Sequence, residues 1–221
     1  MYFKSRADAG KILSRKLKHH KKENLAVVAL SEGAVIVGAQ IAMKLHGNLS
    51  LLLTENINLP GEPDAIGSIT AVDTFTYNNK YSAGQLEAFN AEYHNYIDEK
   101  RREGIHHLNT LLGEGGEIPR ERLRHHTVIL VSDGLVNGLS LDVAYDYLKR
   151  IAIKRLVVAT PFATVKAIDR MHIIGDEICC LDVINNFISV NHYYDDATIP
   201  PTKDLFRVIK NISLEWAKDR N

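Results

Sequence analysis

One segment of the chain, residues 128–142, constrains the fold more than any other. It passes from an apolar run through an acidic turn and two glycines into an amphipathic stretch, Val128-Ile-Leu-Val-Ser-Asp-Gly-Leu-Val-Asn-Gly-Leu-Ser-Leu-Asp142. An apolar run without alternation is typical of a strand that is buried on both faces of a parallel sheet. We therefore predict a buried strand over residues 127–131, then a loop, and then a helix that starts near Ser140.

The predicted loop carries groups that suit a phosphorylated sugar. Gly134 and Gly138 bracket it, and the helix N-terminus follows directly. Backbone N–H groups at such a turn attract phosphate, and the carboxylate of Asp133 can accept hydrogen bonds from ribose hydroxyls. The same residues also fit an ordinary strand-to-helix turn in which Ser140 caps the helix. The segment predicts an anion site and leaves the plain turn open as the alternative.

Apolar runs of the same kind recur along the chain, at residues 25–30, 49–53, 155–160 and 177–183. Stretches with helical periodicity separate them, which is the pattern of β-α-β units. We expect an α/β fold, with a mainly parallel sheet and helices on both faces. In such sheets ligands bind beyond the carboxyl ends of the strands, so the loops that follow these strands are the candidate site.

The middle of the chain differs from this pattern. Residues 55–66 are rich in Asn, Pro and Gly and predict a loop, and residues 66–77 predict a hairpin or strand pair. Residues 83–112 have apolar side chains at helical spacing and predict one long helix or two consecutive ones, ended by Gly113, Gly115 and Gly116. We interpret 83–112 as a helical insertion beside the rim of a single domain that spans residues 1–221. Near the end of the chain, Phe187 to Tyr193 is weakly strand-like.

Composition narrows the class of protein. The chain has 221 residues, of which 45% are hydrophobic and 24% charged, and its formal net charge is zero. A neutral chain has no global field that would attract nucleic acid or an anionic membrane, so neither is an expected partner. No stretch resembles a signal peptide or a membrane span. We expect a cytoplasmic protein.

Cysteine and histidine patterns give little sign of a disulfide or a metal. Cys179 and Cys180 are adjacent, and a bond between them would distort the backbone, so buried free thiols are expected. Histidine pairs occur at residues 19–20, 106–107 and 125–126. Adjacent residues do not share a helix face, which makes each pair a poor two-ligand site, and no metal-binding residues are assigned.

The segment around Asp133 resembles the diphosphoribosyl-binding loop of type I phosphoribosyltransferases. That loop has two acidic residues, Gly, two further residues, Thr-Gly, a small residue and Thr. Here Ser132 stands at the first acidic position, and Asn137 and Ser140 stand at the threonines. Leu139 replaces the small residue.

Most of the chain is similar to one bacterial branch of that family. Residues that match the family lie in the first helix and near the end of the chain, and two segments correspond to its pyrophosphate loop and its second loop. They are Phe3, Ser5, Arg6, Ala9, Gly10 and Leu13; Leu30-Ser-Glu-Gly-Ala-Val35; Glu55 to Ser68; Pro161-Phe-Ala163; and Asp176-Glu-Ile-Cys-Cys-Leu181. The resemblance implies a phosphoribosyltransferase-like fold and a ribose phosphate or diphosphoribose ligand, with Mg²⁺ as a possible cofactor.

The resemblance also implies the site residues. Asp133 is the candidate catalytic residue. The candidate substrate-binding residues are Ser132, Asp133, Gly134, Asn137, Gly138, Leu139, Ser140, Glu32, Gly33 and Ala34.

Charged residues at the implied site depart from the family pattern in one direction. Glu32 stands where the pyrophosphate loop normally has Arg, and Glu55-Asn56 replaces an Arg-Lys pair. A carboxylate beside pyrophosphate repels it by about 1–4 kcal/mol in a partly solvated site. Two functions stay open: phosphoribosyl transfer to an unidentified nitrogen nucleophile, or a non-catalytic relative that binds a ribose phosphate, a nucleotide or a protein. Transfer would need cations from Arg101, Arg102 or a neighbouring subunit of a homo-oligomer.

Overall fold

The computed structural model describes residues 2–113 and 118–218, with side chains up to residue 212. Its elements are β1 (Phe3–Ser5), α1 (Arg6–Lys16), η1 (Lys18–Lys22), β2 (Leu25–Ala29), α2 (Glu32–Leu45), β3 (Asn48–Leu51), β4 (Thr54–Ile57), β5 (Gly67–Thr70), β6 (Phe75–Tyr77), α3 (Ala83–Leu112), η3 (Arg120–Arg122), β7 (Thr127–Val131), α4 (Leu139–Leu148), β8 (Arg155–Thr164), α5 (Val165–Ile174), β9 (Glu177–Ile184), η4 (Val190–Tyr193), β10 (Tyr194–Asp196) and α6 (Thr202–Lys218).

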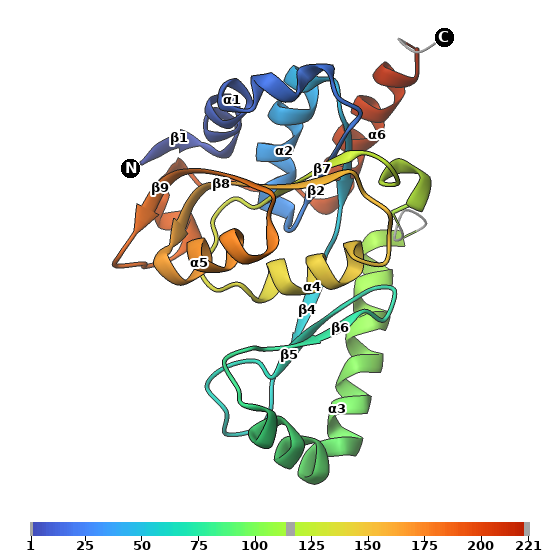
Figure 1. Cartoon of the computed structure of the whole chain (residues 1–221), viewed down its shortest axis with the longest axis vertical. Helices are drawn as coiled ribbons and strands as arrows, with labels where there is room; N and C mark the ends of the chain where they lie inside the picture. Colours follow the sequence, from blue (N-terminus) through green and yellow to red (C-terminus); the bar gives the residue numbers. More distant parts are fainter. Residues whose placement is uncertain (1, 114–117, 219–221) are drawn as a thin grey trace.

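A five-stranded parallel sheet forms the centre, in the order β3-β2-β7-β8-β9. Helices cover both faces, with α1, α2 and α6 on one side and α4 and α5 on the other (Figure 1). The buried strands explain this arrangement, because their alternate side chains enter different cores. Val27 and Ile129 pack with the first group of helices, whereas Val28 and Leu130 pack with the second. The predicted α/β class and its mainly parallel sheet are confirmed.

A second group of elements lies below the main sheet in Figure 1. Strands β4, β5 and β6 form an antiparallel sheet, and α3 packs against it. Helix α3 is a single element with a kink at Tyr93, and it begins with a capping box formed by Ser82 and Gln85. It ends at the C-cap Gly113, while Gly115 and Gly116, which we also expected to end it, lie outside the described residues.

Two expectations about local structure were wrong. The loop predicted over residues 55–66 begins as strand β4, because Thr54 and Glu55 pair with Thr70 and Ile69 far along the chain. The weak strand expected near Phe187–Tyr193 is mostly irregular and ends in the short helix η4. The strand comes just after it, as β10, and it pairs with the N-terminal β1 through Phe3 and Tyr194.

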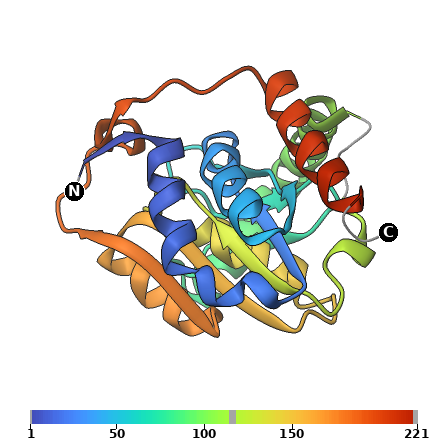
Figure 2. The same ribbon diagram turned by 90° about the horizontal axis from the view of Figure 1, so that it is seen from above.

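The chain after β10 connects distant parts of the fold. It runs from the side where the N-terminus lies across to α6, which packs against α2 (Figure 2). Within the described residues, no helix combines the length and the apolar character needed to cross a membrane.

Candidate functional site

A cleft of about 940 Å³ lies beyond the carboxyl ends of β2, β3 and β7. It brings together the loops that follow these three strands, the last turns of α3, and the segment that leads into α6. The lining residues are Arg6, Leu30, Ser31, Glu32, Gly33, Leu53, Thr54, Glu55, Asn56, His107, Leu108, Leu111, Asp133, Gly134, Leu135, Val136, Asn137, Leu139, Ser140, Val190, Asn191, Ile199 and Thr202.

Ser31 links the first two loops of the cleft. Its hydroxyl oxygen accepts a hydrogen bond from the backbone N–H of Ala34 at 2.9 Å, which caps the N-terminus of α2. The same hydroxyl donates to Oδ1 of Asp133 at 2.7 Å. The amide of Ala34 is therefore already used, and its side chain is buried in the core below the cleft. Ala34 supports the loop and does not line the cleft.

Asp133 forms a buried ion pair with Arg6. The guanidinium Nε lies 2.8 Å from Oδ2, and the two side chains are 2% and 9% exposed. The remaining Arg6 nitrogens donate to the backbone carbonyl of Ala197 and to Oδ1 of Asn191 at 2.6 Å. Arg6 thereby joins the start of α1, the loop after β7 and the segment before α6. The sequence marked Arg6 only as a shared position of the first helix and missed this role.

Gly33 is required by the close approach of these groups. A Cβ atom built at Gly33 would overlap Oδ2 of Asp133 and would lie 2.6 Å from Nε of Arg6. Carbon atoms cannot approach oxygen or nitrogen so closely without displacing them. The first turn of α2 therefore depends on glycine to reach the ion pair.

The turn after β7 is held mainly by its own groups. The hydroxyl of Ser132 accepts from the backbone N–H of Gly134 at 3.2 Å and donates to its carbonyl at 3.0 Å. The hydroxyl of Tyr194 donates to the backbone carbonyl of Asp133 at 2.5 Å. A Cβ on Gly134 would lie 2.5 Å from the ring of Phe162, so this glycine is also required. Ser132 shapes the turn and, unlike Asp133 and Gly134, does not line the cleft.

The N-terminus of α4 opens into the cleft through Asn137, Leu139 and Ser140. The side-chain oxygen of Asn137 accepts from the backbone N–H of Leu139 at 3.4 Å. The N-cap residue is Gly138, so Ser140 lies inside the first turn and does not cap the helix. Gly138 faces the other way, because its missing Cβ would meet the side chain of Arg170 at 2.5 Å. Together with Asn137 and Leu139 it lines a second hollow on the side of Arg170, and its place at the anion site stays a prediction.

Negative charge predominates in the cleft. Among its described lining residues, Arg6 is the only Arg or Lys, and Asp133 neutralises it. Glu32 accepts a hydrogen bond from the hydroxyl of Thr202 at 2.5 Å, and Oε2 of Glu55 lies 2.6 Å from Nδ1 of His107. Arg101 and Arg102, expected as possible cations beside Glu32, instead border another hollow, where Arg101 pairs with Asp73.

The donor set of the cleft fits Mg²⁺ poorly at the implied position. Both carboxylate oxygens of Asp133 have protein partners, one in Arg6 and one in Ser31. Mg²⁺ binds through one or two carboxylates together with water and phosphate oxygens, and a cationic guanidinium beside Oδ2 disfavours a second cation there. The other implied acidic position holds Ser132, whose hydroxyl is bonded to Gly134.

Comparison with known proteins places the chain among relatives of one kind. No protein-family model matches the chain. It is 23% identical over 197 residues to a protein named putative phosphoribosyl transferase in two strains of Mycobacterium tuberculosis, CDC 1551 / Oshkosh and ATCC 25618 / H37Rv. The chain resembles the type I phosphoribosyltransferases. The match covers 89% of this chain and 44% of each relative, so the chain spans less than half the length of these proteins.

A solved structure matches almost the whole fold. The crystal structure of TT1426 from Thermus thermophilus has a TM-score of 0.72 and 25% sequence identity. The match covers 98% of this chain and 99% of the other. The elements outside the main sheet, including α3, are thus part of a fold that another protein shares nearly end to end.

Proposed function

We propose that this phosphoribosyltransferase-like protein binds a ribose monophosphate in the cleft, either ribose 5-phosphate or a nucleoside monophosphate. The observation that carries the proposal is the position of Asp133, which Ser31 and Arg6 fix beside the N-terminus of α4. A ribose held at Asp133 would have its phosphate close to that helix end. Each carboxylate oxygen has two acceptor sites, so both retain one for a ribose hydroxyl.

The N-terminus of α4 supplies the attraction for one phosphate group. The first four N–H groups of a helix have no intrahelical acceptor, and the helix dipole adds partial positive charge. The side chains of Asn137 and Ser140 border the same space. This site needs no Lys or Arg, which agrees with the composition of the cleft.

A second phosphate group would meet an unfavourable environment. Glu32 is the first residue of α2, Glu55 lies in β4, and both line the cleft. Phosphoribosyl transfer needs stabilisation of the leaving pyrophosphate, which is usually supplied by cations or by preorganised donors. Because Arg6, the only Arg or Lys among the described residues of the cleft, is paired with Asp133, binding without turnover is the function that we favour.

Two alternatives follow from the same surface. In the first, a neighbouring copy of the chain supplies cations to the cleft, and the protein transfers a phosphoribosyl group. In the second, the cleft binds part of a protein partner and no sugar phosphate. The ligand preference of the isolated chain separates them.

Calorimetry on the purified chain tests the proposal. The ligands are ribose 5-phosphate, the common nucleoside monophosphates and diphosphoribose, each with and without Mg²⁺. We expect at least one monophosphate to bind more tightly than diphosphoribose, and Asp133→Asn to weaken that binding. Asp73→Asn, which alters a surface carboxylate away from the cleft, is the matched control. Tight Mg²⁺-dependent binding of diphosphoribose, with pyrophosphate release when a base is added, would establish transfer instead.

A further inference from the structure

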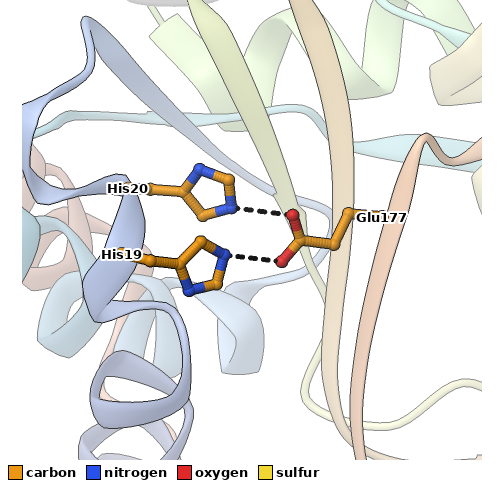
Figure 3. Close-up of side chains that lie close together, drawn as sticks. All are labelled: His19, His20 and Glu177. Carbon is orange, nitrogen blue, oxygen red and sulfur yellow. Dashed lines mark hydrogen bonds and ion pairs between the residues drawn. The ribbon is translucent and has the colours of Figure 1, made fainter.

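Two histidines and a glutamate, His19, His20 and Glu177, lie close together near the amino ends of β2 and β9 (Figure 3). His19 and His20 belong to the short helix η1, just before β2, and Glu177 is the first residue of β9. Nε2 of His19 lies 2.9 Å from Oε1 of Glu177, and Nε2 of His20 lies 3.1 Å from Oε2. One carboxylate thus faces both rings.

We expected adjacent histidines to point in different directions and so to form a poor two-ligand metal site. For His19 and His20 this geometric expectation was wrong. It assumed an α-helix, in which adjacent side chains diverge. Here the pair sits on a 3₁₀ turn, and the ring centroids are 4.1 Å apart. The three ligand atoms all lie within 4.8 Å of one another.

These distances are close to those of a zinc site. Zinc binds imidazole nitrogen and carboxylate oxygen at about 2.0–2.2 Å, so neighbouring ligand atoms of a tetrahedral ion are about 3.3 Å apart. The two histidine nitrogens face different oxygens of Glu177, at 2.9 and 3.1 Å, and the three ligand atoms lie within 4.8 Å of one another, so side-chain adjustments alone can bring them to one ion. Two imidazoles and one carboxylate also form a ligand set that zinc uses, with a fourth position left for water.

The surroundings of His20 point to a cation at this place. The side chain of His20 is fully buried, and its two ring nitrogens both face carboxylates: Nδ1 lies 2.8 Å from Oε1 of Glu23, and Nε2 faces Glu177. A neutral imidazole has a single N–H, so it can donate to only one of them. A metal ion bound to Nε2 and to Glu177 would satisfy the second contact.

Glu23 has the position of a supporting residue for a metal ligand. A carboxylate that accepts the Nδ1–H of a histidine fixes the tautomer and leaves Nε2 free to bind metal. Glu23 is itself held by the hydroxyl of Thr127 at 2.6 Å and by Lys154 at 3.4 Å. His19 is 56% exposed, which gives an ion access from solvent.

We infer that His19, His20 and Glu177 bind one divalent transition-metal ion, with zinc as the best fit. The ion would tie η1 to the start of β9 and so fix the edge strand of the sheet. Its distance from the cleft, at the other ends of the strands, makes it a structural site that is independent of the sugar-phosphate ligand. Iron(II) and nickel(II) accept the same ligands, so the binding affinities of the three metals must be compared.

Metal titration of the tag-free chain tests this site. The chain is first stripped with a chelator, and binding of zinc, nickel and iron(II) is measured by competition with a chromophoric chelator, with iron kept anaerobic. We expect one zinc ion per chain, and an increase in melting temperature of about 5–10 °C at zinc concentrations near 100 times Kd.

Variants locate the ion. His19→Ala changes a half-exposed side chain and should lower zinc affinity at least tenfold, as should Glu177→Gln. Glu23→Gln should lower it about 10- to 100-fold, because a neutral amide oxygen supports the His20 ring more weakly than a carboxylate does. His94→Ala is the matched control, because His94 is an exposed histidine that faces a single carboxylate, Asp98, and it should leave affinity unchanged. Circular dichroism of the stripped variants checks that they are folded.

Two results would overturn the inference. One is the absence of stoichiometric binding for all three metals. The other is zinc affinity that His19→Ala and Glu177→Gln leave unaltered. In either case the contacts of His20 with Glu23 and Glu177 belong to the protein alone and involve no metal.

Discussion

Arg6 and Asp133 are 127 positions apart in the sequence and form an ion pair with a nitrogen–oxygen distance of 2.8 Å. The pair connects the start of α1 with the loop after β7, and it defines the floor of the cleft. A buried pair of this kind has a stability role that can be separated from ligand binding.

Removal of one partner should be costly. Arg6→Met leaves the Asp133 carboxylate buried without its cation, which costs about 3–5 kcal/mol. For a chain of this size that corresponds to a fall in melting temperature of about 6–20 °C. Arg6→Met with Asp133→Leu should lose less than the sum of the single variants, because no unpaired charge remains. The exposed pair of Arg207 and Asp204 is the control, and Arg207→Met should cost under about 1 kcal/mol.

The two glycines of the predicted site should respond differently to alanine. Gly33→Ala places a methyl group against Asp133 and Arg6, and we expect a loss of about 1–3 kcal/mol in stability together with weaker binding of ribose 5-phosphate. Gly138→Ala meets Cγ and Cβ of Arg170, so it should also lower stability, but its methyl group points toward α5 and its effect on binding should be small. If both variants lose the same amount of ribose 5-phosphate affinity, Gly138 takes part in the anion site.

The sequence was sufficient to predict the main sheet for a physical reason. Strands such as Thr127–Val131 are buried on both faces, and continuous apolar runs have few other places in a folded domain. Strand β4 was missed because its polar residues, Glu55 and Asn56, carry no such signal and depend on pairing with β5. The local sequence pattern therefore predicted the buried strands of the main sheet. It missed β4, a polar strand whose formation depends on pairing with another segment.

The site was harder to predict than the fold. The candidate loops could be chosen because carboxyl ends of parallel strands share one edge, and the cleft indeed gathers residues from all three loops. The ion-pair partner of Asp133 could not be predicted, because no sequence pattern near Asp133 or Arg6 links the two residues. The direction of Gly138 also depends on α5, which contributes Arg170. Contacts between distant segments set the chemistry of the cleft.

Both cysteines should react slowly in the folded protein. They are half-buried and free, not fully buried as the sequence suggested, because β9 is an edge strand. Burial raises the pKa of Cys179 from 9.0 to about 11, which lowers its thiolate fraction near neutral pH about 100-fold, and burial also raises the pKa of Cys180. Alkylation by iodoacetamide at about pH 7.5, followed by mass spectrometry, should be slow in buffer and fast in urea. Rapid labelling in buffer would show that β9 opens.

Glu23 should contribute a pH-dependent part of the stability. Hydrogen bonds from Thr127 and then from His20 lower the pKa of Glu23 from 4.5 to about 2. A carboxyl group with a lowered pKa in the folded state stabilises the fold above its unfolded pKa, and this contribution disappears as pH falls from about 4.5 to about 2. Urea unfolding of the wild type and Glu23→Gln should differ at about pH 6, and the difference should shrink across that window. Glu87→Gln, on an exposed face of α3, should show no such trend.

Glu32 is the residue whose replacement best separates sugar-monophosphate binding from phosphoribosyl transfer. Its carboxylate borders the cleft at the position where the resembling family has Arg, and Thr202 holds it there. We expect the wild type to prefer ribose 5-phosphate or a nucleoside monophosphate over diphosphoribose. Glu32→Arg should reverse that preference by about tenfold or more, because a guanidinium can bind phosphate through two parallel hydrogen bonds. Glu32→Gln removes the charge without adding a cation, and its ligand preference should fall between those of the wild type and Glu32→Arg.

Because Mg²⁺ can shield pyrophosphate from a carboxylate, calorimetry is required with and without the ion. If the wild type already prefers diphosphoribose and both variants bind it equally well, Glu32 does not face the second phosphate and the charge argument against transfer fails.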